Sequence, residues 1–377
     1  MAFRFLALLT VFFGLVTPAS AGAGDELRGI WVTRWTYASA SDVRRIMSEV
    51  SEAGFNAVFF QVRGQHDAFY PSAIEPWAAE LTGALGKDPG WDPLAVAVEA
   101  GHAHGLQVHA YINAFTLWRG ESPPAVVEPL HAWHRHPEWI AADSEGLPMA
   151  LNAHYVFASP GNPEVRRRLA AVAKDIADRY PIDGIHLDYI RYPGRDQGHD
   201  VASLAAWEAD GRPDFSAWRR QAVTRAVAEV RGAVSVPVTA AVWGLYKNPW
   251  GWTEVSEGFA DYHQDANAFT AQGHVDGLIP MTYWTVAPGQ RLDVEAIIND
   301  HMTRSNGRHV YAGVRADPAW SAEQVEAVIR AARRQGAHGV VLFEYREGRR
   351  LFEHLRQGVF AQPAKPPKMK WRYDGPE

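Results

Sequence analysis

Two carboxylate side chains lie near the ends of short β-rich runs: Asp188 in Gly184–Arg191 and Glu344 in Gly339–Tyr345. Side chains alternate along a strand, so Asp188 shares a face with His186. Strands of a closed parallel barrel are buried on both faces, so polar side chains on one face are expected to line the interior near the carboxyl end. Two carboxylates at such a mouth suit glycosidic-bond hydrolysis, in which one protonates the leaving oxygen and the other attacks or activates water.

Glu344 is placed on an inner face by the same parity, because it alternates with Val340 and Leu342. Asp188 and Glu344 are the only carboxylates that fall at the carboxyl end of an expected strand on such a face. Asp67 and Asp265 are loop carboxylates that could join them. We therefore expect Asp188 to be essential and Glu344 to be its partner, with Asp67 and Asp265 as reserve candidates.

Tryptophan is frequent, and seven of the 15 indoles fall near expected strand ends or in the loops that follow. An indole presents a flat apolar face with a hydrogen-bond donor on its rim, which matches the C–H face and hydroxyl edge of a pyranose ring. This pattern indicates a carbohydrate-binding mouth. The seven are Trp35, Trp118, Trp243, Trp250, Trp252, Trp284 and Trp320.

The composition excludes several other chemistries. The 377 residues include no cysteine, so thiolate nucleophiles, Cys-ligated metal sites and disulfides are ruled out. The formal charge of −6 argues against a nucleic-acid binder, whose surface would be basic. We therefore expect a glycan as the partner, no nucleic acid and no cofactor.

The elements that must position these residues alternate regularly between strand and helix, which indicates an α/β fold. Eight such repeats predict a parallel sheet closed as a (β/α)8 TIM barrel. A doubly wound open sheet is the alternative, but it calls for a glycine-rich loop after the first strand, where the chain has Thr33-Arg34-Trp35. The expected strands are Leu27–Thr33, Ala57–Arg63, Leu106–Asn113, Gly184–Arg191, Val236–Trp243, Gly277–Trp284, His309–Val314 and Gly339–Tyr345. The expected helices are Ser41–Ala53, Asp92–His104, Pro163–Tyr180, Phe215–Arg231, Asp261–Gln272, Asp293–Ser305, Ser321–Gln335 and Arg349–Gln357.

The connections are uneven in length. Segments before strands are short, and Asp183 and Asp276, which lie in them, are expected to serve as turn or cap carboxylates. Segments after the second and third strands are long, at about Gly64–Trp91 and Ala114–Asn162. Long loops in a compact domain are usually functional, so we expect the site on the carboxyl-end face.

The two ends of the chain differ from the barrel. Residues 1–21 contain a basic Arg4, an apolar run and a small-residue cleavage pattern, which predicts a signal peptide. No cysteine follows the run and no other stretch is long and apolar enough to cross a membrane. We expect an exported protein, periplasmic or extracellular, that is not a lipoprotein and has no stable membrane insertion. The barrel is expected over residues 22–358. Residues 359–377 are expected to be a proline- and lysine-rich tail without chemistry, either an extended strap or a disordered end.

The histidines offer weaker evidence for chemistry. His102 and His104 fall late in an expected helix, away from the mouth. His131, His134 and His136 lie in the long loop after the third strand, where a metal site is conceivable. We expect these three to be solvated loop side chains, and no metal site.

From about Glu26 to Tyr345 the sequence resembles the glycosyl-hydrolase-like 10 family of exported bacterial proteins. The resemblance implies a TIM-barrel glycosidase that acts on bacterial polysaccharide, in particular on peptidoglycan glycan strands stripped of stem peptides. The matching motifs are Gln61–Ser72 (QVRGQHDAFYPS), Glu75–Trp77 (EPW), Asp92–Asn113 (DPLAVAVEAGHAHGLQVHAYIN), His136–Ile140 (HPEWI), Asn162–Ala170 (NPEVRRRLA), Asp183–Pro193 (DGIHLDYIRYP) and Gln264–Trp284 (QDANAFTAQGHVDGLIPMTYW).

Two departures from the family pattern concern the site. The chain has Asn113-Ala114-Phe115 where the family often has Asn-Pro-Tyr, and it has Asp188-Tyr189 where the family often has two aspartates. A mechanism that uses paired aspartates is therefore in doubt, whereas Asp188 acting as nucleophile, as stabiliser of an oxocarbenium-like centre or as orienter of a substrate acetamide stays open. The side chains expected to bind the sugar are Gln61, Arg63, Tyr111, Asn113, His186, Arg191, Tyr192, Trp243, Tyr283 and Trp284.

Three functions are compatible with these residues. A glycoside hydrolase is favoured. A non-catalytic glycan-binding barrel is second, because aromatic and amide side chains bind sugar without an acid pair. A metal-dependent deacetylase is third, because the sequence has no evident ligand set for the metal.

Overall fold

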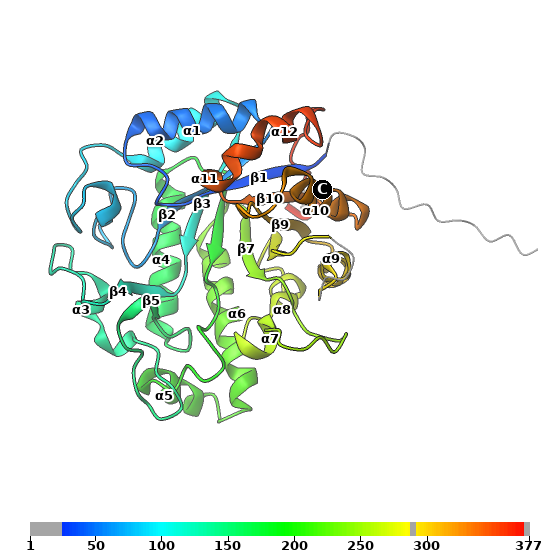
Figure 1. Cartoon of the computed structure of the whole chain (residues 1–377). Helices are drawn as coiled ribbons and strands as arrows, with labels where there is room; N and C mark the ends of the chain where they lie inside the picture. Colours follow the sequence, from blue (N-terminus) through cyan, green and yellow to red (C-terminus); the bar gives the residue numbers. More distant parts are fainter. Residues whose placement is uncertain (1–24, 287–291, 373–377) are drawn as a thin grey trace, which may run out of the picture.

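The computed structural model describes residues 25–286 and 292–372, in which eight parallel strands close a barrel (Figure 1). The expected TIM-barrel fold is confirmed. Around the ring the strands pair in the order β1-β10-β9-β8-β7-β6-β3-β2. They are β1 (Leu27–Val32), β2 (Ala57–Arg63), β3 (Gln107–Asn113), β6 (Gly184–Asp188), β7 (Val238–Trp243), β8 (Gly277–Met281), β9 (His309–Arg315) and β10 (Gly339–Phe343).

Helices surround this barrel (Figure 1). The expected helix Asp261–Gln272 is divided into two short helices, because the Asp265 side chain accepts the Ala268 N–H and begins a new helix there. The longer helices are α1 (Ala40–Glu52), α2 (Pro93–Ala103), α4 (Pro163–Arg179), α5 (Val201–Ala209), α6 (Phe215–Ala233), α9 (Val294–Thr303) and α10 (Ala322–Arg334). The shorter ones are α3 (Ala132–Arg135), α7 (Gly258–Asp261), α8 (Ala266–Ala271), α11 (Tyr345–Gly348), α12 (Phe352–Gln357) and the 3-10 turns η1 (Ala79–Leu81), η2 (Pro137–Trp139), η3 (Arg349–Leu351) and η4 (Lys370–Arg372).

The long segments after β3 and β6 contain structure that the sequence analysis treats as loop. After β3 the chain forms an antiparallel pair, β4 (Thr116–Gly120) and β5 (Asn152–Phe157), with α3 and η2 between them. After β6 it forms α5 (Figure 1). Both excursions leave the carboxyl ends of their strands, so they extend the wall on the face where the site is expected.

Apolar side chains fill two separate layers. The inner layer lies inside the barrel and includes Trp31, Phe59, Tyr111 and Tyr311. The outer layer packs the helices against the strands. The inner layer is so close-packed that a Cβ at Gly29 would lie 2.7 Å from the Phe59 ring, which explains why that strand position is glycine.

Asp183 and Asp276 bind the amino-terminal ends of neighbouring strands, as expected from their place before β6 and β8. An oxygen of Asp183 accepts the Val108 N–H at 2.7 Å, and one of Asp276 accepts the Val238 N–H at 2.9 Å. These carboxylates take up backbone donors at strand ends and thereby stabilise the register of the sheet.

The tail crosses this amino-terminal end of the barrel as a strap. The Glu26 N–H donates to the Lys365 carbonyl, which adds the tail to the start of β1. Further on, the Trp371 indole and the Arg372 guanidinium each donate to an Asp276 oxygen at 2.8 Å. The described part of the tail is thus tied to the strand ends through Lys365, Trp371 and Arg372.

Two further expectations concern the membrane and the signal segment. Among residues 25–286 and 292–372, no helix has both the length and the apolarity needed to span a bilayer. The predicted signal peptide, residues 1–21, lies outside the described residues, and so does the end of the tail after Arg372.

We predict that Trp371→Ala lowers the free energy of unfolding by about 2 kcal/mol, because it removes a hydrogen bond to Asp276 and the indole contact with His309. Urea unfolding followed by circular dichroism measures this change. Lys370→Ala alters an exposed neighbour on the same tail and is the matched control. Equal midpoints for the Trp371→Ala variant and the native chain would show that the strap contributes nothing.

Candidate active site

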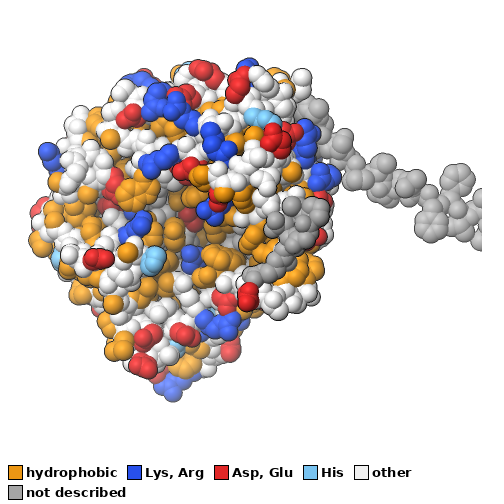
Figure 2. Space-filling view, viewed as in Figure 1, with side chains coloured by type: hydrophobic (Ala, Val, Ile, Leu, Met, Phe, Trp, Pro, Cys, Tyr) orange, Lys and Arg blue, Asp and Glu red, His pale blue; other side chains and the backbone are white. Residues whose placement is uncertain are grey.

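A pocket of about 500 Å³ opens at the carboxyl ends of the barrel strands. In the view of Figure 2, apolar side chains gather around a hollow near the middle of the molecule. Three tryptophans and three tyrosines give the pocket its aromatic character, and one carboxylate and two guanidinium groups give it charge. It is lined by Trp31, Tyr111, Asp188, Tyr189, Arg191, Ala241, Trp243, Gly244, Met281, Tyr283, Trp284, Arg315 and Phe343.

Asp188 supplies that carboxylate, from the end of β6. The Tyr111 hydroxyl donates to its Oδ2 at 2.7 Å, and the Tyr189 N–H donates to its Oδ1 at 2.6 Å. Tyr189 has a φ of +49°, the left-handed conformation, and this turn presents its N–H to the carboxylate. Burial raises the pKa of the Asp188 carboxyl above its usual range, and these two hydrogen bonds and Arg191 only partly oppose that rise.

A hydrogen-bonded histidine supports the bottom of the pocket. The Trp31 indole N–H donates to His186 Nε2 at 3.0 Å, so this nitrogen carries no proton. The proton therefore lies on Nδ1 and is donated to Thr239 Oγ1 at 2.9 Å. Burial lowers the pKa of His186 far below its usual value. His186 is thus a neutral, fixed partner of Trp31.

The aromatic walls are held by contacts behind them. The Trp243 indole donates to the Ser256 carbonyl at 2.8 Å and packs on Tyr262 with ring centres 4.2 Å apart. Tyr283 stacks on Phe343 at 5.6 Å. A Cβ at Gly244 would lie 2.3 Å from the Met281 carbonyl, so only glycine lets β8 approach this closely. The Trp243 and Tyr283 rings are therefore held in position before a ligand binds.

The structure brings six of the expected site residues together in the pocket, including Asp188 and the two tryptophans expected to stack on sugar. The eight others do not line it: some support its walls, and the rest are buried or lie elsewhere. The six are Tyr111, Asp188, Arg191, Trp243, Tyr283 and Trp284.

Arg63 and Tyr192 are not placed to bind sugar. Arg63 is fully buried, pairs with both oxygens of Glu75 at 2.8 Å and donates to the Asn113 and Ala114 carbonyls. The β2–β3 register shifts between Gln61 and Arg63, which separates Arg63 from the inner-face alternation. Tyr192 is fully buried in the outer layer. The prediction that these two contact a sugar is wrong.

Gln61, Asn113 and His186 support the walls instead of lining the pocket. Gln61 accepts the Arg34 N–H at 2.9 Å, and Asn113 donates to the Gly64 carbonyl at 2.9 Å. Each is at most 3% exposed, and His186 is completely buried. Their expected role as direct sugar ligands is therefore corrected to a positioning role.

The two reserve carboxylates, Asp67 and Asp265, also lie outside the pocket. Asp67 is fully buried and accepts the N–H groups of Gly64 and Gln65, so it fixes the turn after β2. Asp265 caps α8, accepts the Tyr246 hydroxyl at 2.8 Å and borders a different hollow beside α6. Neither lines the pocket of Asp188, so the structure gives no support to their reserve catalytic roles.

The prediction that Glu344 shares an inner face with Val340 and Leu342 is wrong. Val340 and Leu342 face the outer layer, whereas Val341 faces the interior and Phe343 lines the pocket. Glu344 itself follows the end of β10, where strand alternation no longer applies. Its Oε2 accepts the Thr33 hydroxyl at 3.1 Å, and burial raises the pKa of its carboxyl. Glu344 thus lies beside the mouth, next to the pocket residue Phe343.

Several pocket residues were not among the predicted site residues. Trp31 could have been found by parity, since it alternates with Gly29 in β1 and points inward. Arg315, at the end of β9, could have been found by its position alone. Met281 and Phe343 carry no polar signal that would distinguish them from core residues.

The loop histidines are more ordered than expected. His131 is completely buried, its Nε2 donates to the Gln65 carbonyl at 2.8 Å and its Nδ1 accepts the Trp133 N–H. The prediction of a solvated side chain is wrong for His131, because it caps α3. His136 stacks on Trp139 with ring centres 4.0 Å apart.

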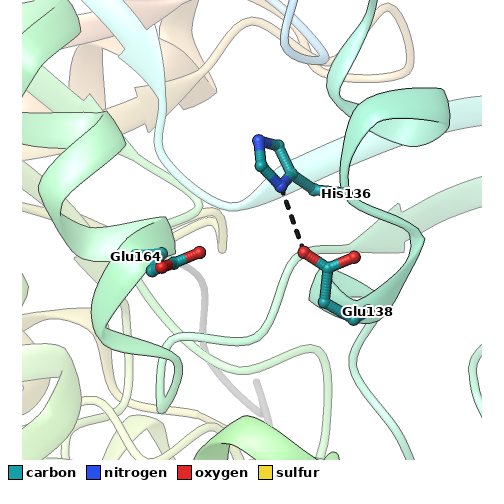
Figure 3. Close-up of side chains that lie close together, drawn as sticks. All are labelled: His136, Glu138 and Glu164. Atoms are coloured by element: carbon teal, nitrogen blue, oxygen red, sulfur yellow. Dashed lines mark hydrogen bonds and ion pairs between the residues drawn. The ribbon is translucent and has the colours of Figure 1, made fainter.

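His136 also belongs to a group that could hold a metal ion. Ligand atoms of His136, Glu138 and Glu164 lie within 4.8 Å of one another (Figure 3). His136 Nδ1 is 3.1 Å from Glu138 Oε1, and both glutamates are exposed. None of the three lines the pocket, so such an ion would lie outside the site described here.

The chain was compared with families and with known proteins. The family model described as Glycosyl hydrolase-like 10 matches residues 26–329. "Glycosyl hydrolase YngK" of Bacillus subtilis (strain 168) is 26% identical over 413 residues, which cover 98% of this chain and 79% of that protein. "Glycosyl hydrolase DigH" of Escherichia coli (strain K12) is 25% identical over 354 residues, which cover 82% and 77%.

Solved structures share the barrel. The catalytic domain of β-amylase from Paenibacillus polymyxa has a TM-score of 0.56 at 13% identity and covers 87% of this chain and 94% of its own. Endo-1,4-β-mannanase from Rhizomucor miehei has a TM-score of 0.57 at 9% identity and covers 90% and 96%. At such identities the likeness concerns the fold alone.

We predict that Asp188→Asn stabilises the protein at neutral pH. A carboxyl whose pKa is raised on folding destabilises the native state above that pKa, and the penalty disappears as the pH falls toward the pKa of the unfolded chain. The gain in stability should therefore be largest at neutral pH and shrink on acidification. Unfolding at several pH values measures it.

The exposed Asp178→Asn variant is the control for this comparison, because it changes the same group outside the pocket. A destabilised Asp188→Asn variant, or a gain that is constant across pH, would contradict the burial argument.

Proposed function

The chain belongs to the glycosyl hydrolase-like 10 family, and from this premise we propose that it is a glycosidase that hydrolyses O-glycosidic bonds in a bacterial cell-envelope polysaccharide. One observation carries the proposal: Asp188, a carboxylate with a raised pKa, lies in an aromatic pocket at the carboxyl ends of the barrel strands. Catalytic residues of TIM-barrel enzymes lie at this face.

Asp188 is proposed to act on the anomeric centre. The hydrogen bonds from Tyr111 and Tyr189 fix the direction of its two oxygens. A carboxylate held this way either attacks the sugar, stabilises its oxocarbenium-like transition state or orients the substrate's own acetamide as the nucleophile. The rings of Trp243 and Trp284 would stack on the sugar faces.

Glu344 is our candidate for the proton donor. Strands β6 and β10 are four positions apart in the ring of eight, so Asp188 and Glu344 come from opposite sides of the mouth. Burial raises the pKa of Glu344, which favours the protonated form that a general acid needs. Its carboxyl bonds to Thr33 and would have to turn from that hydroxyl to reach a leaving oxygen.

The proposed substrate is the peptidoglycan glycan strand without stem peptides. This assignment rests on the motif resemblance, on the aromatic pocket and on the predicted signal peptide, residues 1–21, which would bring the enzyme to the cell envelope. The proteins similar to this chain are called glycosyl hydrolases, and their names state no substrate.

A non-catalytic glycan-binding barrel is the second candidate function. It is favoured by one observation: among the described residues that line the pocket, Asp188 is the single carboxylate. Hydrolysis usually takes two.

We predict that the protein shortens peptide-free glycan strands and that Asp188→Asn lowers kcat by about 10²- to 10⁴-fold, since it removes a group that acts in the transition state. Mass analysis of the products released from peptide-free strands and intact peptidoglycan measures this. Asp178→Asn is the control and should keep full activity. Retention without any released sugar would favour the binding barrel, and released acetate would favour a deacetylase.

We predict that Glu344→Gln lowers kcat on glycan strands but spares aryl glycosides, whose leaving groups need little protonation. Activity of the native enzyme should fall as the pH rises through the raised pKa of Glu344, because the acid must be protonated to act. This alkaline limb should disappear in Glu344→Gln. An unchanged rate and pH profile would show that Glu344 is not the proton donor.

A further inference from the structure

The pocket contains a guanidinium group that forms no salt bridge with any carboxylate of the described residues. Arg191 lines the pocket, and no carboxylate oxygen of the described residues lies within 4.0 Å of its nitrogens. The one hydrogen bond that it donates goes to the Tyr192 carbonyl, at 3.0 Å. Two fully buried arginines nearby do have carboxylate partners: Arg63 pairs with Glu75, and Arg34 with Glu80. Arg191 therefore keeps donors for a ligand.

Aromatic rings hold this guanidinium in place. Its carbon lies 4.6 Å from the ring centre of Tyr262, 5.3 Å from Tyr189 and 5.4 Å from Trp243. Cation–π contacts of this kind orient an arginine and leave the edge of its planar fork free. Because Trp243 also lines the pocket, the fork lies beside a surface on which a sugar ring can stack.

A second cation lies on the same wall. Arg315 lines the pocket from the end of β9, and its half-exposed side chain pairs with Asp317 at 3.2 Å. The charged residues that line the pocket are thus two arginines and Asp188. Because Arg315 has Asp317 as its partner, Arg191 is the lining cation without a salt bridge among the described residues, and its charge favours an anionic ligand.

We propose that Arg191, assisted by Arg315, forms an anion subsite that binds the free carboxylate of an acidic sugar unit. A guanidinium fork matches a carboxylate with two parallel hydrogen bonds. In a strand of peptidoglycan, such a carboxylate is the lactyl group of muramic acid after its peptide has been removed. With the peptide attached, the same carboxyl is an uncharged amide. The subsite rests on the proposed function and would explain a preference for peptide-free strands.

A uronic acid has the same chemistry, so the test must separate the two sources. Four probes are needed: peptide-free glycan strands, the same strands with their carboxyls amidated by methylamine, chitin oligosaccharides without carboxylates, and hyaluronan oligosaccharides with uronates. Binding is measured by calorimetry in the Asp188→Asn background, which prevents turnover.

We predict that peptide-free strands bind at least about 10-fold more tightly than the amidated strands, and that Arg191→Gln removes this preference by weakening only the charged probe, by about 10- to 100-fold. Arg191→Lys should keep part of it, because the charge remains but the fork is lost. Arg167→Gln, on an exposed part of α4, is the matched control. Equal binding of both probes, or an equal loss for both in Arg191→Gln, would overturn the anion subsite.

Two further outcomes keep the proposals distinct. If Arg191→Gln does not fold, the half-exposed Arg315→Gln should still reduce the preference several-fold, and no reduction would count against the subsite. Tight binding of hyaluronan in place of peptide-free strands would support a carboxylate subsite but overturn the muramic acid assignment. A preference for the charged strands in a native protein that releases no product would support the subsite and overturn the glycosidase.

Discussion

Desolvation of the half-buried Asp188 carboxylate is the constraint on which the rest of the site depends. The barrel places it opposite Asn113 in the β3–β6 register, with the Tyr111 hydroxyl on one oxygen. Removing a carboxylate from water raises its pKa and destabilises the fold, and only part of that cost is offset by two hydrogen bonds. The remaining cost is offset by the stability of the rest of the fold. This stability comes from the closed sheet, the inner aromatic layer and the tail across the amino-terminal end of the barrel.

The fold was predictable because each strand and each helix leaves a local pattern in the sequence. The barrel repeats this strand–helix pattern eight times. The alternation of side chains correctly predicted the inner face in regular strands, where it placed Tyr111 and Asp188. It failed at β10, because the inner face there carries Val341, and Glu344 lies beyond the last paired residue. It failed again at Arg63, because a register shift lies between Gln61 and Arg63. Such irregularities depend on neighbouring strands and leave no mark in the sequence of one strand.

Residue type alone also gave wrong predictions at positions where burial determines the role of the side chain. A polar side chain near a strand end suggests a residue that binds a ligand. Arg63, Asn113 and Asp67 instead form their hydrogen bonds with backbone groups of the protein. Each fixes a turn or a carbonyl behind the wall of the pocket. Arg191 differs because its neighbours are rings, which orient its charge, and it forms no salt bridge with the described residues. The distinction between a supporting polar residue and a binding one thus lies in the partners, which the sequence does not state.

The anion subsite and the catalytic carboxylate are also coupled. Arg191 holds the pKa of Asp188 lower than burial alone would set it. A substrate carboxylate bound to Arg191 would cancel that influence and add a negative charge near Asp188, and both effects favour protonation of Asp188. An acidic sugar would therefore oppose the ionisation that Asp188 needs in order to attack or to stabilise a cation, whereas a neutral sugar would not. Recognition of the charge on the glycan and the acid–base state of the site are in this way two consequences of one guanidinium beside one buried carboxylate.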